Sequence, residues 1–222
     1  MKNFADLAID IADSNGATYC DIRIIEKQTQ NIETKNGRVG AVEEDNSFGF
    51  GVRVLAEGAW GFSASLDLSN ANLRKTTLEA IRIAKASAQV KKNEVFLTPA
   101  RLTYQDIWQT PVQKDPFQIS LHRKIDLLLR IGEVLQKNPG VKIARGFMSF
   151  GKEKKFFASS EGTRTDQTII FSSVGYEATA VEGDELQTRS YPNSFRGQFQ
   201  TKGYELIEEL PLLENAERVA EE

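Results

Sequence analysis

Hydrophobic residues occupy every second position in two neighbouring runs between Phe48 and Ser65. A period of two is typical of a β-strand, and the glycine-containing break at 56–58 between the runs predicts a hairpin. We expect the large side chains of both runs to lie on one face of this hairpin, against a hydrophobic core. These alternating residues are Phe48, Phe50, Val52, Val54, Trp60, Phe62 and Ala64.

Gly49 and Gly51 leave the opposite face of the first strand nearly bare. Glycine weakens the interior of a strand, so two glycines on one face indicate a bend or a close approach by another backbone. A functional groove over the bare strand is the alternative interpretation. The sequence leaves both interpretations open.

Apolar residues with helical spacing predict four helices. The predicted helices lie near 4–14, 70–89, 120–137 and 211–222. Asn15-Gly16 and Asn138-Pro139-Gly140 follow the first and third of them, and such residues commonly end a helix. Pro211 suits the first turn of the last helix, because its missing N–H would have no partner there in any case.

The remaining period-two runs predict a sheet. The predicted strands, besides the hairpin, are 19–34, 39–44, 141–150, 154–159, 168–179 and 185–191. Asn36-Gly37 favours a tight hairpin turn, and Asp45-Asn46 is interpreted as a second turn. Residues 91–116 have no sustained period and contain three prolines, so we interpret this segment as a connector over the surface. The pattern predicts an α+β fold with a twisted, mainly antiparallel sheet and helices packed against it.

The glycine-containing turns of the first part of the chain recur with the same spacing in the second part. An offset of 125 residues superposes Gly37 on Gly162 and Gly58 on Gly183. The same offset places the strand after the first helix on the strand after the third. We therefore predict two similar helix–sheet–helix halves, 1–97 and 115–222, joined by a connector at 98–114.

Composition and charge narrow the classes of function. The chain has 222 residues, of which 40% are hydrophobic and 27% charged, as in ordinary globular proteins. A net charge of -3 without a Lys/Arg cluster argues against nucleic-acid binding. We see no apolar run of signal-peptide or membrane-span length. The single cysteine, Cys20, cannot form an intramolecular disulfide, which fits the predicted cytoplasmic location.

The sequence offers no recognisable catalytic or metal-binding set, so we predict no catalytic residue and no metal ligand. His122 is the only histidine, whereas a zinc site needs three or four His, Cys or carboxylate ligands. No serine lies in the nucleophile motif G-x-S-x-G. The acidic runs 43–45 and 182–185 are interpreted as solvated tips beside turns, with a site for a hard cation as the second interpretation.

A polar and aromatic segment, 189–198, is the best candidate for binding. It contains two arginines, two aromatic residues and several amide or hydroxyl groups, and long irregular loops on a sheet often carry function. We predict that Arg189, Tyr191 and Phe195 contact a substrate. Alternatively, the two aromatic residues only fasten the loop to the sheet.

Several short motifs resemble the TldD/PmbA family, the so-called modulators of DNA gyrase, and specifically its TldD-type branch. The resemblance extends over essentially the whole chain and matches the amino-terminal domain of the family. The motifs are Gly51-Val52-Arg53-Val54-Leu55, Gly58-Ala59-Trp60-Gly61-Phe62, Phe157-Ala158-Ser159-Ser160-Glu161-Gly162 and Arg189-Ser190-Tyr191-Pro192.

The resemblance implies that the complete protein is a zinc-dependent metallopeptidase that degrades unfolded or extended peptides. It also implies a dimer, formed by two copies or with a PmbA-type subunit. The family's metal-binding histidines and catalytic glutamate lie on a helix soon after the region where this chain stops. We therefore expect residues 1–222 to be the amino-terminal domain, without the carboxy-terminal metallopeptidase domain, without zinc and inactive alone.

Two functional hypotheses follow from this resemblance. In the first, the chain cradles substrate and contacts the other subunit of such a peptidase. In the second, it is a stand-alone, non-enzymatic binding or dimerisation module. An H-E-x-x-x-H-like motif in the parent gene beyond Glu222 would favour the first hypothesis.

Overall fold

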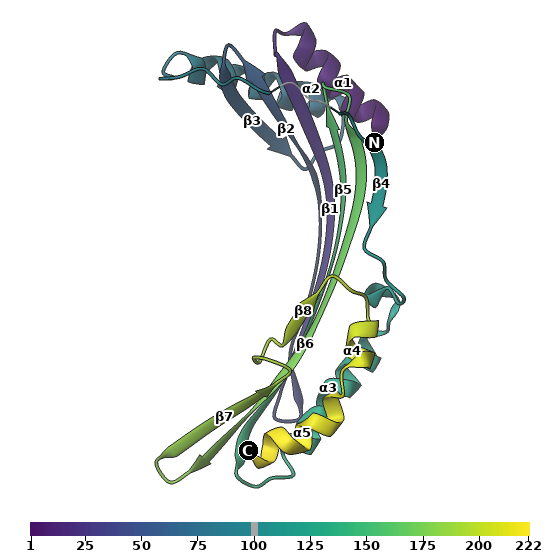
Figure 1. Cartoon of the computed structure of the whole chain (residues 1–222), viewed down its shortest axis with the longest axis vertical. Coiled ribbons are helices and arrows are strands. Elements are labelled where there is room, and N and C mark those ends of the chain that lie inside the picture. The colour runs from purple at the N-terminus through teal and green to yellow at the C-terminus, as the bar shows by residue number, and fades with distance from the viewer. Residues whose placement is uncertain (99–101) are drawn as a thin grey trace. The chain divides into compact units, whose positions relative to one another are not determined.

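The structure of the protein is a computed structural model that describes residues 1–98 and 102–222. Figure 1 shows the order of the elements along the chain. The helices are α1 (Lys2–Ser14), α2 (Asn70–Ala88), the 3-10 helix η1 (Pro116–Gln118), α3 (Leu121–Leu135), α4 (Glu205–Glu209) and α5 (Leu212–Glu221). The strands are β1 (Tyr19–Lys35), β2 (Arg38–Ala56), β3 (Ala59–Ser65), β4 (Gln105–Gln109), β5 (Val141–Ser159), β6 (Arg164–Glu182), β7 (Glu185–Tyr191) and β8 (Gln198–Gln200).

The predicted α+β fold is confirmed. The described strands form one sheet of eight strands in the order β3-β2-β1-β5-β6-β4, with β7 and β8 also paired with β6. The pairs β2–β3, β6–β7 and β6–β8 are antiparallel. The order helix, strands, helix occurs twice, as the repeated spacing of the turns predicted, with three strands in the first repeat and four, β5 to β8, in the second. No described helix has both the length and the apolar character that a membrane span would need.

The chain divides into two compact units that do not follow the order of the sequence. Unit 1 comprises residues 1–27, 47–108 and 153–168, and unit 2 comprises 28–46, 109–152 and 169–222. The strands β1, β2, β5 and β6 each contribute to both units. The two halves predicted from the sequence, 1–97 and 115–222, therefore correspond to the repeated order of helices and strands and not to the two compact units.

Four local predictions differ from the structure. Strand β2 runs through Asp45-Asn46 without a turn, and β5 joins the two strands predicted at 141–150 and 154–159. The connector 98–114 contains the short strand β4, whereas its residues 99–101, including Pro99, lie outside the described residues. Strand β8 and helix α4 lie between the predicted strand 185–191 and the predicted helix 211–222, where the sequence analysis assigned no regular element.

Small side chains let the helices of unit 1 approach its strands closely. The core of this unit contains alanines of α1 and α2 together with apolar residues of β1 and β2. Phe50, Val52 and Val54 are buried, as predicted. Gly61 of β3 faces α2 so closely that a Cβ there would lie 2.5 Å from the Ala84 amide nitrogen.

The second strand of the predicted hairpin faces the other way from our expectation. The hairpin exists, but a two-residue turn at Glu57-Gly58 pairs Val54 with Gly61 and Arg53 with Phe62. Directly paired residues of an antiparallel sheet share a face. Phe62 therefore lies on the face of Arg53 and not on the core face, and its side chain is exposed.

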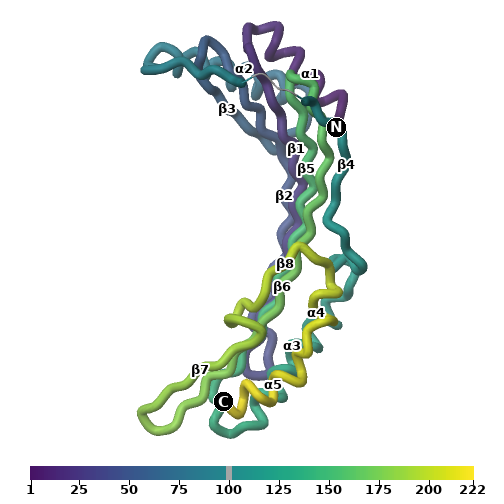
Figure 2. Tube along the Cα trace, in the orientation of Figure 1, coloured from purple at the N-terminus to yellow at the C-terminus, as the bar shows by residue number. Residues whose placement is uncertain are grey.

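Helices α3, α4 and α5 cover one face of the sheet in unit 2, as Figures 1 and 2 show. Their apolar residues enclose a core with Met148 and Phe150 of β5 and with Val174 and Tyr176 of β6. The Tyr176 hydroxyl donates a hydrogen bond of 2.7 Å to the Leu212 carbonyl oxygen and so connects the sheet to α5. We call the sheet face opposite these helices the open face of unit 2.

Candidate functional site

Arg189 and Tyr191 lie on β7, on the helix-covered face of unit 2. The register pairs Arg189 with Ala178 and Tyr191 with Tyr176, and both partners belong to the helix-covered core. The Tyr191 ring is half-buried, with its centroid 5.7 Å from that of Tyr176. Arg189 is exposed and donates to the Thr188 carbonyl oxygen at 3.1 Å. Tyr191 thus helps to fasten β7 to the core.

Phe195 lies on the open face. Its ring centroid is 5.7 Å from that of Phe147, which alternates along β5 with the core residue Met148. The Arg145 guanidinium lies 5.7 Å from the centroid of the Phe195 ring. The structure therefore separates Phe195 from Arg189 and Tyr191, and their contact with one substrate stays a prediction.

The β7–β8 loop is held on the open face by its backbone. A Cβ at Gly175 of β6 would lie 2.7 Å from the Phe195 carbonyl oxygen, so only glycine leaves room for the loop. The Ser173 hydroxyl donates a 2.7 Å hydrogen bond to the Arg196 carbonyl oxygen. Gly197 has a φ of +70°, a region that favours glycine over other residues. These contacts fix the positions of Phe195 and Arg196.

A hollow of about 340 Å³ lies on the open face beside this loop. Its apolar wall is formed by the aromatic rings of Phe147, Phe171 and Phe199. Its polar wall is formed by Asn31, Glu43 and Ser149 of the strands and by Arg196 of the β7–β8 loop. An Asn31–Ser149 hydrogen bond of 2.7 Å and an Arg196 guanidinium 5.5 Å above the Phe147 ring order these groups.

The hollow offers both stacking surfaces and hydrogen-bonding groups. Phe199 is exposed, and its ring centroid lies 6.2 Å from that of Phe171. Arg145 forms a 3.5 Å ion pair with Glu177, whereas its buried Nε has no hydrogen-bond partner in the described part of the chain. Aromatic faces beside guanidinium, amide and hydroxyl groups suit an extended chain with mixed side chains.

Sequence reasoning missed Asn31, Ser149, Phe171 and Phe199 of this site. The alternation of Arg145, Phe147 and Ser149 with apolar core residues along β5 was the available signal. This alternation indicated that the second face of β5 carries large and polar side chains. It did not indicate that β1 lies beside β5, because the pairing of distant strands cannot be predicted from a local pattern.

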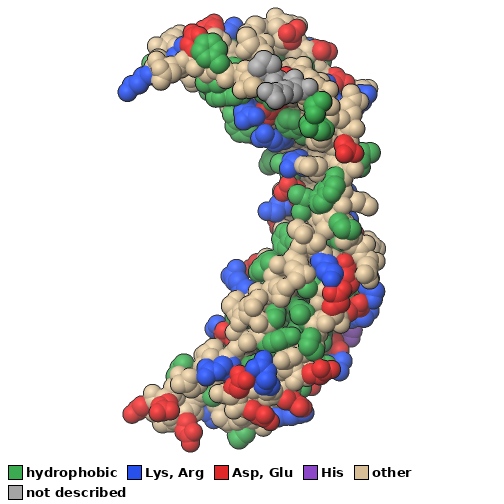
Figure 3. All heavy atoms as spheres, viewed as in Figure 1, with side chains coloured by type: hydrophobic (Ala, Val, Ile, Leu, Met, Phe, Trp, Pro, Cys, Tyr) green, Lys and Arg blue, Asp and Glu red, His purple; other side chains and the backbone are tan. Residues whose placement is uncertain are grey.

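The acidic runs and the histidine do not come together. Across residues 1–98 and 102–222, no three His, Cys, Asp or Glu side chains gather as they would to hold a metal ion. This donor set does not fit a zinc site. Glu182 and Glu185 flank the exposed tip of the β6–β7 hairpin, where Figure 3 shows acidic side chains, and this confirms a solvated tip. The run 43–45 is exposed within β2 and not beside a turn.

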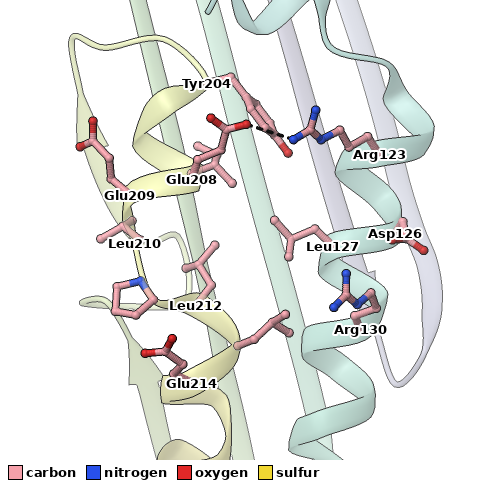
Figure 4. A pocket seen from close by; sticks show the side chains of 13 residues that line it. Arg123, Asp126, Leu127, Arg130, Tyr204, Glu208, Glu209, Leu210, Leu212 and Glu214 are labelled. Atoms are coloured by element: carbon pink, nitrogen blue, oxygen red, sulfur yellow. Dashed lines mark hydrogen bonds and ion pairs between the residues drawn. The ribbon is translucent and has the colours of Figure 1, made fainter. Parts of the chain in front are cut away.

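A larger groove of about 630 Å³ lies between α3 and the pair α4 and α5. Figure 4 shows Arg123 of α3 pointing toward Glu208 of α4, and their ion pair is 3.0 Å long. Glu208 also bonds Lys114, and the Arg123 guanidinium lies 5.7 Å from the Tyr204 ring centroid. Because these central charges already have partners, we consider the open-face hollow the better binding candidate.

Two family models match the chain. One is described as PmbA/TldA metallopeptidase domain 1 and matches residues 20–84, and the other is described as the PmbA/TldA metallopeptidase central domain and matches residues 114–222. Among curated proteins, the chain is similar to Metalloprotease MJ0996 of Methanocaldococcus jannaschii, with 25% identity over 76% of this chain and 37% of that protein. It is also similar to Metalloprotease slr0863 of Synechocystis sp., with 28% identity over 82% and 38%.

Solved structures share the fold. A modulator of a DNA gyrase from Thermotoga maritima matches with a TM-score of 0.77 and 20% identity, over 100% of this chain and 47% of that chain. TldE from Thermococcus kodakarensis matches with a TM-score of 0.65 and 12% identity, over 100% and 46%. The chain spans about two fifths of the length of the two curated relatives. From the two family models together, the chain belongs to the PmbA/TldD metallopeptidase family.

Proposed function

We propose that this chain is the amino-terminal, substrate-cradling and subunit-contact part of a TldD-type zinc metallopeptidase that acts on unfolded or extended peptides. The observation that carries this proposal is the match of both family models, together with the name metalloprotease of the curated relatives. The chain spans about two fifths of those relatives. The zinc ligands and the catalytic base are then supplied by sequence outside residues 1–222.

The open face of unit 2 is the proposed cradle. Strand β8 pairs only with β6 among the described strands, so its outer edge can accept an extended peptide through backbone hydrogen bonds. Such pairing needs no particular side-chain sequence, which suits a peptidase for unfolded chains. Phe195 and Phe199 offer rings to the side chains of that peptide, while Arg196 and Asn31 offer polar contacts.

The proposed subunit contact lies on β4 and the residues just before it. Leu102, Tyr104, Ile107 and Trp108 are all exposed, and an exposed apolar strand commonly marks a protein interface. The partner is a second copy or a PmbA-type chain. Analytical ultracentrifugation of the chain, alone and with a PmbA-type subunit, tests this contact. Sedimentation of the chain as a monomer in both samples would contradict the proposed subunit contact.

Alanine at both Phe195 and Phe199 should raise the dissociation constant for a fluorescein-labelled, unfolded peptide about tenfold, measured by fluorescence anisotropy. Loss of two stacking rings accounts for about 1.4 kcal/mol or more of binding free energy. Leu186→Ala is the matched control, because Leu186 is an exposed apolar residue of β7 outside the hollow. An unchanged dissociation constant in the double variant would contradict the cradle.

Arg189→Ala tests the sequence-based candidate separately, because Arg189 lies on the other face of the sheet. It should weaken the same peptide severalfold if Arg189 contacts substrate, since a guanidinium can bond peptide carbonyl oxygens. Arg189 is preferable to Tyr191 for this purpose. Tyr191→Ala would also remove the contact with Tyr176 and so confuse binding with stability.

The purified chain should hold far less than one zinc ion per molecule by elemental analysis, and it should leave a fluorogenic peptide library uncut with or without added zinc. Metal-assisted hydrolysis needs about three protein ligands, an open position for water and a nearby base. The described residues bring no such set together. Cleavage by this chain that a chelator abolishes would show that the active site lies within residues 1–222.

A further inference from the structure

Two tilted aromatic rings form one wall of the hollow on the open face of unit 2. A Cβ at Gly151 of β5 would lie 2.0 Å from Cε1 of Phe171, so only glycine leaves room for this ring over the strand. The rings of Phe171 and Phe199 have an interplanar angle of 44°. Phe199 is 52% exposed, so its ring is accessible to a ligand in the hollow.

Two carboxylates line the same hollow from other strands of the sheet. Glu33 belongs to β1 and Glu43 to β2, whereas the tilted rings belong to β6 and β8. Strand β5 lies between β1 and β6. Glu33 is half-buried and Glu43 is exposed, and neither forms an ion pair with any residue of 1–98 or 102–222. Both carboxylates are therefore accessible acceptors.

The hollow already holds one cation that belongs to the chain itself. The Arg196 guanidinium lies 5.5 Å from the centroid of the Phe147 ring, a distance typical of a cation–π contact. Arg196, Glu33 and Glu43 are the charged residues that line the hollow. Two carboxylates against one guanidinium leave one formal negative charge in excess. A second cation would balance that charge.

A cationic side chain is the ligand that suits both walls. The face of an aromatic ring attracts a cation, and a carboxylate accepts strong, charge-assisted hydrogen bonds. An anionic side chain would meet two like charges. A purely apolar side chain would cover the carboxylates without pairing them, which costs free energy. Among cations, a guanidinium is planar, so it can stack on a ring and donate to a carboxylate at the same time.

We propose that the hollow binds an arginine side chain of an unfolded peptide. The guanidinium stacks on Phe199 and donates to a carboxylate of Glu33 or Glu43, while Arg196 stays on Phe147. The methylene groups of the ligand arginine pack against the rings, as the stems of long charged side chains commonly do. The inference rests on the proposed function, because the cradle holds the backbone of the same peptide. It adds the type of residue that the cradle selects.

The test compares two fluorescein-labelled, unfolded peptides that differ in one residue. One peptide carries arginine, and the other carries citrulline, which has nearly the same shape but a neutral urea group. Binding to the 222-residue chain at low ionic strength is measured by fluorescence anisotropy. The arginine peptide should bind about fivefold more tightly, because only its side chain gains both the cation–π contact and the ion pair. Equal affinity of the two peptides would overturn the proposal.

The double variant Glu33→Gln/Glu43→Gln should remove this preference. It should lower the affinity for the arginine peptide to that for the citrulline peptide and leave the citrulline peptide unchanged. The matched control is Glu182→Gln/Glu185→Gln, which removes the same charge at the exposed tip of the β6–β7 hairpin. The control variant should keep the preference of the parent chain.

The outcomes separate this inference from the cradle. If the Glu33→Gln/Glu43→Gln variant keeps the preference for arginine, or if the control loses it equally, the hollow is not its source and the proposal is overturned. If both peptides bind the parent chain with equal affinity, this inference fails and the cradle stands. If neither peptide binds, the cradle fails and this inference fails with it.

Discussion

Gly61→Ala should destabilise unit 1 by about 3 kcal/mol, at the upper end of what overpacking costs in a well-packed core. A Cβ at this position would overlap the Ala80 carbonyl oxygen and lie 2.5 Å from the Ala84 amide nitrogen, both in the backbone of α2. A backbone cannot rotate aside as a flexible side chain can. Helix α2 must therefore move away from β3, and it loses contacts of Ala80, Ile81 and Ala84 with the core.

Both tryptophans of the chain, Trp60 and Trp108, belong to unit 1. Denaturant unfolding followed by tryptophan fluorescence therefore reports this unit. Leu78→Ala in α2 is the control, because Leu78 also belongs to unit 1 and its side chain is exposed. We expect Leu78→Ala to stay within about 1 kcal/mol of the parent chain. Equal midpoints for the two variants would contradict the close packing of α2 on β3.

The sequence predicts elements better than it predicts faces, and the β2–β3 hairpin shows why. Alternation identified both strands, and the glycine-containing break at 56–58 identified the turn between them. The face of the second strand depends on whether the turn holds an odd or an even number of residues. A three-residue break at 56–58 would have kept Phe62 on the core face, whereas the observed two-residue turn places it beside the bare backbone of Gly51. A difference of one residue in the length of the turn thus decides whether Phe62 lies in the core or on the opposite face of the sheet.

The candidate site of unit 2 shows the same limit over longer range. The segment 189–198 was recognisable from its composition, and Phe195 lies on the open face. The face of Tyr191 follows from its pairing with Tyr176, which only the register of β6 with β7 reveals. Asn31 and Ser149 are 118 positions apart in sequence and form one hydrogen bond. Contacts of this kind depend on strand order, which local patterns do not encode.

Lys124→Met should raise the stability of unit 2 at pH 7 by about 2 kcal/mol. Lys124 lies in the first turns of α3 and is completely buried. Its Nζ donates a hydrogen bond to Gln30 Oε1 and lies 4.3 Å from the Phe150 ring centroid. Burial lowers the pKa of Lys124 to about 8, and the carboxylates of Glu44 and Asp115 oppose this shift only in part.

The lowered pKa of Lys124 determines how the stability of the folded chain changes with pH. The unfolded chain binds the proton up to about pH 10.4, whereas the folded chain releases it near pH 8. Between these values the unfolded state holds more protons, so stability rises with pH, by about 2 kcal/mol between pH 7 and 9.5. The pKa of Tyr176 is raised above its usual value by burial, so that group contributes a loss of stability only above about pH 10.

Methionine has a similar length to lysine and no charge to bury. It removes a desolvation cost of about 3 kcal/mol at pH 7 and forfeits the hydrogen bond to Gln30, which costs about 1 kcal/mol. Far-UV circular dichroism during denaturant unfolding at pH 7 and 9.5 measures both effects. Lys137→Met is the control, because the Lys137 side chain is 70% exposed.

If Lys124→Met unfolds at a lower denaturant concentration than the parent chain at pH 7, the buried ammonium contributes net stability and its desolvation does not dominate. In that case the parent chain should also fail to gain stability between pH 7 and 9.5, because its pKa would then lie near the value of the unfolded chain.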